Sequence, residues 1–586
     1  MVDVSPELKQ AFNPNDGNGE RVIDYSLVFY VVNNEAQAEA VPQVPAEQQA
    51  SEISRAVQIT DGQSTPIKFV TFETSGWPLD GSGCVPPRVN EASGAEIGLV
   101  MNDLSDENRE FEDTQNITIT TPSKHNLLGF ILDWGDSVAC DFQVDFWSDN
   151  AIVHTVQVTG NTKSSFKNDW AVQDVNKVVV HVSKTALPYR RVRLCEITFG
   201  SIKTYNKANS GTLTISESID PMNERVPANE LKMSVDNFAR EYNIFDPTGV
   251  YAYFQDRQVM EPSIGAMKED GTFEYIPMGR YYLRKPKLSG NLSKLEFTAV
   301  DALGQLQDTT YSKGHYMSGS MFQFVSGIAS DAGVRVVHPL SFIAIPVHSY
   351  IPSVSHADAL RMIAQATNTV LSANRRGEIE FASLGEDSIM DLTCYDYRMN
   401  NGFSPSDDEP YNAVKVEYMN VRAGSQAEVL ATATGTGTLY ISYDPSTNHS
   451  FTIDGGELQS AEFYVDNAVL TITGGTVTIS GKKLIIDKNS LVKSAARPGE
   501  QLYIKEIKGN PFIDASRAEK VADYALRMIA QKRRIVQISY RGYPYLEMGD
   551  IVRYNTGEYI TAPFFITKST FNLNGGMTGT LESRER

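Results

Sequence analysis

Cysteine is scarce in this chain of 586 residues, which contains only four: Cys84, Cys140, Cys195 and Cys394. None of them lies in a C-x-x-C pair, and four cysteines are too few for a chain of this length to depend on disulfides. The composition therefore excludes the disulfide-rich secreted class of proteins and suits a reducing compartment.

Long apolar segments are also missing. The apolar stretch nearest the start, residues 22–32, is short, contains Asp24, and lacks both a basic flank and a cleavage site. It is better interpreted as a strand than as a signal peptide. The sequence predicts no membrane span and no export by a signal peptide.

Positive charge is in deficit, with 52 Lys and Arg against 72 Asp and Glu, a formal net charge of −20. The acidic residues are spread along the chain, and the one short basic run, residues 532–534, ends a predicted helix, where cations are favoured anyway. Nucleic-acid binding needs a concentrated basic face, so sequence-specific binding is excluded. An acidic protein beside a DNA channel would repel DNA instead of holding it.

Catalytic motifs are absent from the sequence. No two of the eight histidines are three or four residues apart, and there is no nucleophile elbow, Walker loop or dinucleotide-binding glycine motif. Two carboxylate pairs have the composition that a glycosidase uses, Asp145 with Asp149 and Asp133 with Asp136. Such pairs arise by chance among 72 acidic residues, and residues 13–19 lack the ligand order of a calcium loop. The sequence predicts no enzyme, no cofactor and no metal site.

Residues that favour β-sheets are abundant. Hydrophobic residues make up 41% of the chain and aromatics 10%, with 27 Tyr and 26 Phe. The length exceeds what one hydrophobic core usually serves. We therefore expect a mainly β, multidomain protein with a minor α+β part.

The first third of the chain reads as a β-sandwich behind an N-terminal segment. Residues 1–65 contain one strand and then a stretch rich in Ala, Gln, Pro and Glu, which predicts an exposed linker. Residues 66–200 show short apolar runs separated by turn residues, which is typical of a sandwich. The strands expected there are 67–72, 116–120, 127–132, 142–146, 153–158, 175–182 and 191–199.

Helices enter only after a second β region, residues 201–310, which includes an expected strand at 251–254. Residues 311–395 read as a small α+β domain, with helices at 319–331 and after the capping sequence that begins at Ser355. Residues 396–586 return to β structure around a helix at 514–531. Within them, residues 425–490 are rich in Thr, Gly and Ser and read as a β insertion.

The four tryptophans all fall in the predicted sandwich. Indole rings stack on sugar rings, so Trp134, Trp147 and Trp170 are candidate contacts for a glycan. Large aromatic residues in a sandwich are more often part of the core. Both interpretations stay open at the level of the sequence.

The order of several short motifs resembles the tail hub and tail-associated proteins of bacteriophages of Gram-positive hosts. No single motif is diagnostic, but they occur in the same order over most of the chain from about residue 66. They are FVTFE (69–73), WPLDG (77–81), LSDEN (104–108), EITFG (196–200), SESIDP (216–221), PANELK (227–232), PMGRYYL (277–283), FTAVDALG (297–304), SHADAL (355–360), RGEI (376–379) and GYPYLEMGDIV (542–552).

The resemblance implies a discoidin-like β-sandwich at 66–200, a tube-like β-barrel at 201–310, the small α+β domain at 311–395, and a second tube-like barrel at 396–586. The insertion at about 425–490 is not part of the common barrel. Such a protein is a homotrimer in the virion, at the tail tip or baseplate, and is assembled in the host cytoplasm. Its expected partners are the tail tube or distal tail protein, the tape-measure protein and receptor-binding or fibre proteins.

A structural hub that joins the tail tube to the host-binding apparatus and forms part of the DNA exit channel is therefore the leading hypothesis. The alternative is a tail protein that binds or depolymerises glycan on the host surface, with host cell-wall glycan as its partner. The tryptophans favour that alternative, whereas the missing long repetitive β-helix weighs against a depolymerase.

Overall fold

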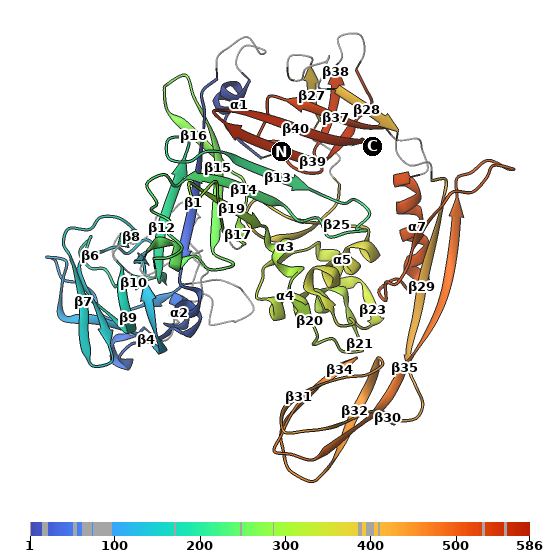
Figure 1. The fold of residues 1–586 in the computed structure, drawn as a ribbon, viewed down its shortest axis with the longest axis horizontal. Coiled ribbons are helices and arrows are strands. Elements are labelled where there is room, and N and C mark those ends of the chain that lie inside the picture. The colour runs from blue at the N-terminus through green and yellow to red at the C-terminus, as the bar shows by residue number, and fades with distance from the viewer. Residues whose placement is uncertain are drawn as a thin grey trace.

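The computed structural model describes residues 2–13, 21–50, 56–60, 73, 97–168, 171–246, 249–284, 286–384, 389–393, 396, 403–407, 411–529, 534–555 and 560–586. The described chain is mainly β and divides into several bodies, each with its own buried cluster (Figure 1). The mainly β, multidomain fold class is confirmed. Within the described part, no helix is both long and apolar enough to cross a membrane.

A sheet of 15 strands forms the centre of the molecule, and both ends of the chain contribute to it (Figure 1). Eleven strands follow one another across it: β12 (Gly200–Asn206), β1 (Ile23–Val32), β15 (Val259–Met267), β17 (Tyr281–Leu283), β19 (Lys294–Val300), β14 (Glu230–Asp236), β13 (Leu213–Ser218), β39 (Phe564–Asn574), β40 (Gly576–Glu585), β37 (Arg534–Tyr540) and β28 (Phe403–Asp407). Four more pair at its sides: β16 (Phe273–Pro277), β18 (Lys287–Ser289), β27 (Ile389–Thr393) and β38 (Ile551–Asn555).

Strand β1 shows why these residues form a sheet. Its side chains alternate between buried and partly exposed along all ten residues, which is the period of two that a strand with one covered face requires. Leu27 and Phe29 are fully buried. The strand pairs antiparallel with both β12 and β15, so it lies inside the sheet. The chain leaves the central sheet after Val32 of β1 and re-enters it at Gly200 of β12, which pairs with Val32.

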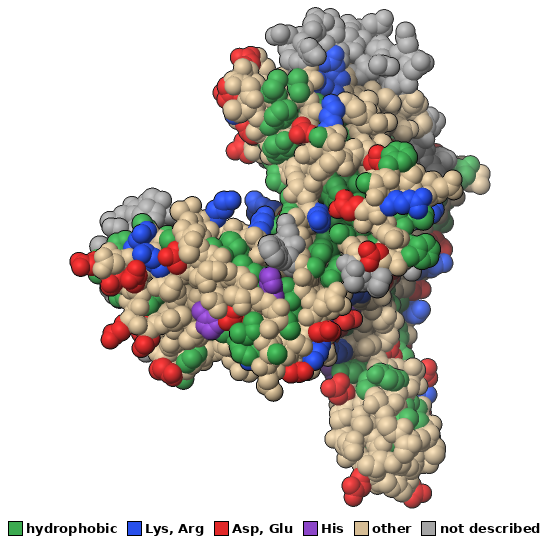
Figure 2. Space-filling model, turned by 60° about the vertical axis from the view of Figure 1, so that its left-hand side comes forward, with side chains coloured by type: hydrophobic (Ala, Val, Ile, Leu, Met, Phe, Trp, Pro, Cys, Tyr) green, Lys and Arg blue, Asp and Glu red, His purple; other side chains and the backbone are tan. Residues whose placement is uncertain are grey.

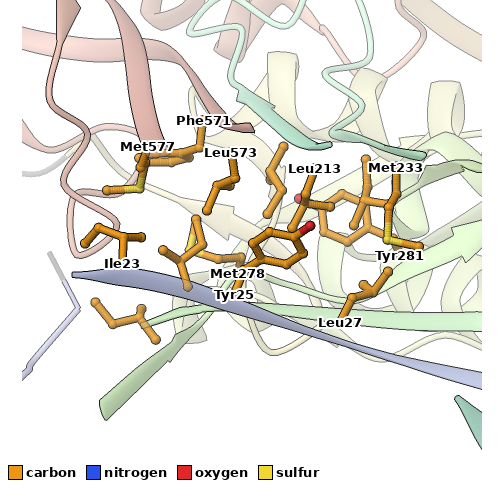
Figure 3. Close-up of a cluster of buried hydrophobic side chains, with 14 of the residues drawn as sticks. Ile23, Tyr25, Leu27, Leu213, Met233, Met278, Tyr281, Phe571, Leu573 and Met577 are labelled. Atoms are coloured by element: carbon orange, nitrogen blue, oxygen red, sulfur yellow. The ribbon is translucent and has the colours of Figure 1, made fainter. Parts of the chain in front are cut away.

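Side chains from both ends of the chain share the core of the central sheet. Figure 3 shows Ile23 and Tyr25 of β1 close to Leu573 and Met577 from the C-terminal strands, with Leu213 next to Leu573. The helix α1 (Pro6–Phe12), which the sequence analysis did not predict, adds Phe12 to the same cluster.

The segment between β1 and β12 folds into two packed sheets. Five strands form the larger sheet, in the order β2 (Val41–Gln43), β4 (Glu110–Leu127), β9 (Val172–Thr185), β6 (Ala139–Ser148) and β7 (Ala151–Val158). Three form the smaller, β11 (Glu196–Thr198), β5 (Phe130–Asp133) and β8 (Ser165–Asn168). One cluster holds Leu132 of the smaller sheet together with Val144 and Val180 of the larger, so the two sheets enclose a single core. Short elements complete the body: α2 (Asn34–Glu39), η2 (Ala46–Gln48), η3 (Ala56–Thr60), and the pair β3 (Leu99–Val100) and β10 (Arg193–Leu194).

A helical body lies beside the central sheet (Figure 1). Its helices are α3 (Ala302–Leu306), α4 (Met321–Ala332), α5 (His356–Thr367), α7 (Ala515–Ile529) and the 3₁₀ turn η6 (Leu340–Ala344). Its strands are β20 (Thr310–Tyr311), β21 (Met317–Ser320), β22 (Val336–Val337), β23 (Pro346–Ser349), β24 (Val354–Ser355), β25 (Val370–Ala373) and β26 (Ile379–Ala382). One buried cluster joins α4, α5 and α7, so α7 packs here although it is far away in sequence.

A long two-stranded arm carries the insertion away from the central sheet, and the insertion contacts the helical body (Figure 1). The arm pairs β29 (Ala413–Ala423) with the second half of β35 (Thr476–Ser494), and β36 (Ile504–Ile507) lies along it. The insertion itself contains β30 (Glu428–Thr434), β31 (Gly437–Ser442), β32 (Ser446–Asp454), β33 (Leu458–Phe463) and β34 (Asn467–Ile472). Its small core holds Leu470, Val477 and Ile479.

Capping signals placed the longer helices correctly. Ser320 and Gln323 form a capping box at the start of α4, and Gly333 ends that helix with a φ of 64°. The side chain of Ser355 accepts a hydrogen bond from the backbone N–H of Asp358 at the start of α5. The helices predicted at 319–331 and 514–531 are confirmed within two residues at the ends that the structure describes, and α5 starts where its capping sequence predicts. Leu371, which continues the apolar stripe of the second predicted helix in the sequence, belongs to β25.

Two local predictions were wrong. Residues 251–254 were expected to be a strand, but they belong to the 3₁₀ turn η5 (Val250–Tyr253) and the residue after it. Tyr251 and Phe254 are three residues apart, so the tight turn brings both rings to one side, with their centroids 5.8 Å apart. The predicted linker contains α2, whose Asn33 cap accepts a hydrogen bond from Ala36 N–H. Residues 67–72 and 77–81 lie outside the described residues, as do residues 14–20 of the N-terminal loop.

Candidate functional site

The carboxylates that a glycosidase would need are engaged in structural contacts. Asp149 accepts hydrogen bonds from Lys124 and Asn176, and the bond from Lys124 lowers the pKa of its carboxyl group. Asp133 accepts from the backbone N–H of Gly135. Asp136 pairs with the nearly buried Arg193 at 2.7 Å. These contacts fix loops and strand ends, which favours a structural role for these carboxylates.

The described residues contain no group of three or more His, Cys, Asp or Glu arranged to hold a metal ion. Cys140 and Cys195 are buried free thiols. Burial raises the pKa of Cys195 to about 12, so this thiol is protonated at neutral pH and is a poor nucleophile.

Trp134 and Trp147, the two candidate tryptophans that the structure describes, do not form one site. Trp134 is fully buried and packs edge-to-face on Phe142 at 5.3 Å, so it is part of the sandwich core. Trp147 on β6 is partly exposed, and the ammonium of Lys177 lies 3.9 Å from the centre of its ring. Trp170 lies outside the described residues. Trp147 is thus the candidate that reaches the surface in the described part.

The two halves of the central sheet join at the seam between β13 and β39. The strands pair antiparallel from Leu213 opposite Leu573 to Ser218 opposite Lys568. Side chains on the exposed face add cross-strand bonds, because the Ser216 hydroxyl lies 3.2 Å from that of Thr570. The seam turns two groups of strands into one continuous sheet.

A buried ion pair ties the helical body to this seam. Glu217 of β13 accepts two hydrogen bonds from Arg375, at 2.8 and 2.6 Å, and the two side chains are 6% and 9% exposed. Arg375 lies in the turn between β25 and β26, where Gly377 has a φ of 80°. It also donates to the carbonyls of Pro544 and Leu546, close to the C-terminal strands. Sequence analysis missed this residue because nothing in an Arg-Arg-Gly turn indicates burial.

Two further polar groups, the partly buried Arg21 and the buried Asp301, stabilise the same region. Arg21 donates to the carbonyls of Arg541, Gly542 and Met577, which ties the entry to β1 to the C-terminal strands. Asp301 caps α3 by accepting from the backbone N–H groups of Gly304 and Asn229, each at 2.8 Å. Desolvation by burial raises the pKa of Asp301 to about 7.

Charge is spread over the surface. Figure 2 shows acidic side chains scattered across the visible face of the molecule, among basic and uncharged ones. Most ion pairs of the described residues involve side chains that are at least partly exposed, for example Arg553 with Asp391. This pattern is that of a solvated surface.

No protein-family model matches this chain, and no curated protein matches it. Among solved structures, the 43 kDa tail protein of prophage MuSo2 from Shewanella oneidensis is similar over 65% of this chain and 95% of its own, with 10% identity and a TM-score of 0.38. The tail protein from Neisseria meningitidis MC58 is similar over 65% of this chain and 94% of its own, with 12% identity and a TM-score of 0.39. The virion of a native gene transfer agent contains a chain that is similar over 65% of this one, with 9% identity and a TM-score of 0.27. The structural neighbours of this chain thus include phage tail proteins and a chain of a gene transfer agent virion.

Proposed function

We propose that this chain is a structural hub at the tail tip or baseplate of a phage particle. It joins the tail tube to the host-binding apparatus and lines part of the DNA exit channel. The observation that carries the proposal is the seam between β13 and β39, because it fuses strands from both ends of the chain into one wall. The collinear motifs of the sequence support the same assignment.

The five-part division of the chain is part of this proposal. The discoidin-like sandwich (66–200) and the small α+β domain (311–395) lie outside the wall, which strands of the two tube-like barrels (201–310 and 396–586) form together with β1 of the N-terminal part. Helix α7 of the last part packs with the α+β domain instead. Three copies with two barrel units each would match a hexameric tube. A closed ring would also cover strand edges that otherwise invite aggregation.

The surface charge suits a channel that DNA crosses without binding. With a net charge of −20, the protein repels the phosphate backbone at long range, so DNA passes without sticking. The side that faces the tail holds the tail tube or distal tail protein and the end of the tape-measure protein. The outward side carries the receptor-binding or fibre proteins. In this account the chain is not an enzyme.

The location of the chain in purified particles tests the proposal. Mass spectrometry of particles from producing cells should detect the chain, and gold-labelled antibody against it should mark one end of the tail. Absence of the chain from purified particles, or label along the capsid, would contradict the hub.

A further inference from the structure

The larger sheet of the sandwich has one face in the core and one face in solvent. Val144 of β6 and Val180 of β9 point inward and are fully buried. The neighbouring residues along the same strands point to the opposite side, because side chains alternate along a strand. These outward residues, which we call the outer face, are Asn116, Thr118, Gln143, Asp145, Trp147, Thr155, Lys177, Val179 and His181.

A hydrogen-bonded row crosses four strands of the outer face. Asp145 accepts from the hydroxyl of Thr155 at 2.7 Å and from the amide of Gln143 at 2.9 and 3.0 Å. His181 lies 3.2 Å from Asp145 through Nε2 and 2.6 Å from the amide oxygen of Asn116 through Nδ1. These contacts fix the orientation of all five side chains. The carbonyl oxygen of Gln143 and the hydroxyl oxygen of Thr155 keep capacity for an incoming hydroxyl group.

An aromatic and apolar strip lies beside this row. Trp147 pairs in register with Lys177 on one side and with Ile152 on the other. Ile152 and Val153 are 49% and 46% exposed. The Lys177 ammonium rests on the indole ring, and no ion pair holds it among the described residues. A single cation–π contact at a wet surface is weak, so a ligand can displace this lysine from the ring.

A pyranose ring has an apolar face and polar hydroxyl groups, which match the aromatic strip and the hydrogen-bonded row of the outer face. Its C–H face is apolar and stacks on an indole, whereas its rim carries hydroxyl groups that both donate and accept. We propose that the outer face binds a neutral polysaccharide, with a sugar ring on Trp147 and its hydroxyl groups at Gln143, Thr155 and Lys177. A polyanionic glycan fits less well, because Asp145 lies at the centre of the row and the whole protein is acidic.

This inference deepens the proposed hub by naming a partner on the host side, and it depends on the hub for the biological source of the glycan. Binding itself depends only on the sandwich. Trp147 is not a member of the sandwich core, whereas Trp134 is. Removal of the Trp147 ring should therefore leave the fold and the oligomeric mass unchanged.

The test uses the full-length chain and soluble glycans. The neutral probes are dextran, mannan, galactan and oligomers of N-acetylglucosamine, and the acidic probes are hyaluronate and polygalacturonate. Calorimetry and tryptophan fluorescence should detect binding of at least one neutral probe. Trp147→Ala should weaken it at least tenfold, Trp147→Phe less, and Gln143→Ala several-fold. Tyr440→Ala is the control, because Tyr440 is an 81% exposed aromatic residue on the insertion.

Three outcomes would overturn the inference. They are binding of no neutral probe, unchanged binding by Trp147→Ala, and binding of acidic probes alone with loss in moderate salt. Light scattering and thermal melts of each variant show whether the fold and assembly persist. A chain that binds glycan but is absent from particles refutes the hub and keeps the glycan site. A chain that is present in particles at the tail end but binds no glycan refutes the glycan site and keeps the hub.

Discussion

The central sheet and the insertion are both antiparallel β structure, yet their contacts span very different distances along the chain. In the central sheet, Ser216 bonds to Thr570, 354 residues away. In the insertion, Thr432 bonds to Thr478, 46 residues away. A sheet closed by distant segments forms only after both ends of the chain are present, whereas a local sheet can fold by itself. The two regions should therefore respond differently to mutation.

The hydrophobic cores of the central sheet and the insertion also differ, in size. The central cluster contains large buried side chains such as Phe29, Tyr281 and Phe571, while the hydrophobic cluster of the insertion contains six buried residues. Small cores give marginal stability. The insertion also exposes rows of threonines that pair across strands, including Thr434 with Thr476 at 2.8 Å. We infer that the central sheet determines the stability of the whole chain and that the insertion is an appended unit.

The largest effect should come from Arg375→Ala. This change leaves Glu217 buried without its cation and removes the donor to two carbonyls near the C-terminal strands, so it should cost about 3–5 kcal/mol. Denaturant unfolding of the main transition measures the loss.

The matched control is Arg553→Ala. Arg553 also forms two hydrogen bonds with one carboxylate, Asp391, but the two side chains are 38% and 44% exposed. Exposed pairs contribute about 0–1 kcal/mol. Equal losses in the two variants would show that burial of the Arg375 pair is unimportant.

Leu470→Ala should destabilise the insertion alone. Leu470 of β34 is fully buried in the small core, and Leu to Ala changes in such positions cost about 2–5 kcal/mol. Scanning calorimetry should show a minor transition that moves to lower temperature while the main transition stays in place. A downward shift of the main transition would mean that the two regions unfold together.

The pH dependence of stability should reveal Asp301. The folded-state pKa of about 7 lies above the ordinary value of 3.8, so the folded state holds this proton more tightly than the unfolded state. The contribution of this raised pKa to the free energy of unfolding is complete below about pH 4 and is lost as pH rises through about 7. Urea melts of the wild type and Asp301→Asn, compared from pH 4 to 8, isolate this group. If the free energy of unfolding depends on pH in the same way in the two proteins, the pKa of Asp301 is not raised.

The smallest effect concerns the attachment of the insertion. Asp466 accepts from the backbone N–H and the hydroxyl of Ser353, both at 2.7 Å and both at an exposed site. Asp466→Ala should cost about 1 kcal/mol or less, while the insertion gains freedom relative to the helical body. We expect faster cleavage by protease near residues 443–446 and an unchanged main unfolding transition. Unchanged cleavage would show that this contact does not hold the insertion against the helical body.

Local signals in the sequence predicted much of the secondary structure. Apolar patterning predicted β1 and the strands β6, β7 and β9 of the sandwich, and caps such as Ser355 predicted the start of α5. Two consecutive glycines, Gly474 and Gly475, are a turn signal in the sequence, and both have positive φ in the turn before β35. These features depend only on residues close together in the chain, so they can be predicted from the sequence.

Long-range features could not be predicted in this way. Nothing near Leu213 indicates that β39 is its neighbour, and Arg375 looks like any surface arginine of a turn. The candidate site shows the same limit, because the type of residue does not distinguish Trp134 in the core from Trp147 at the surface. Only the packing of the two sheets decides which ring meets solvent.

The mass of the purified full-length chain in solution, measured by light scattering and accompanied by negative-stain images, tests the account most directly. The account predicts a trimer with a central opening, because three chains with a fused two-part wall would close a ring. A monomer that persists at the highest attainable concentration, with no opening in the images, would contradict the hub.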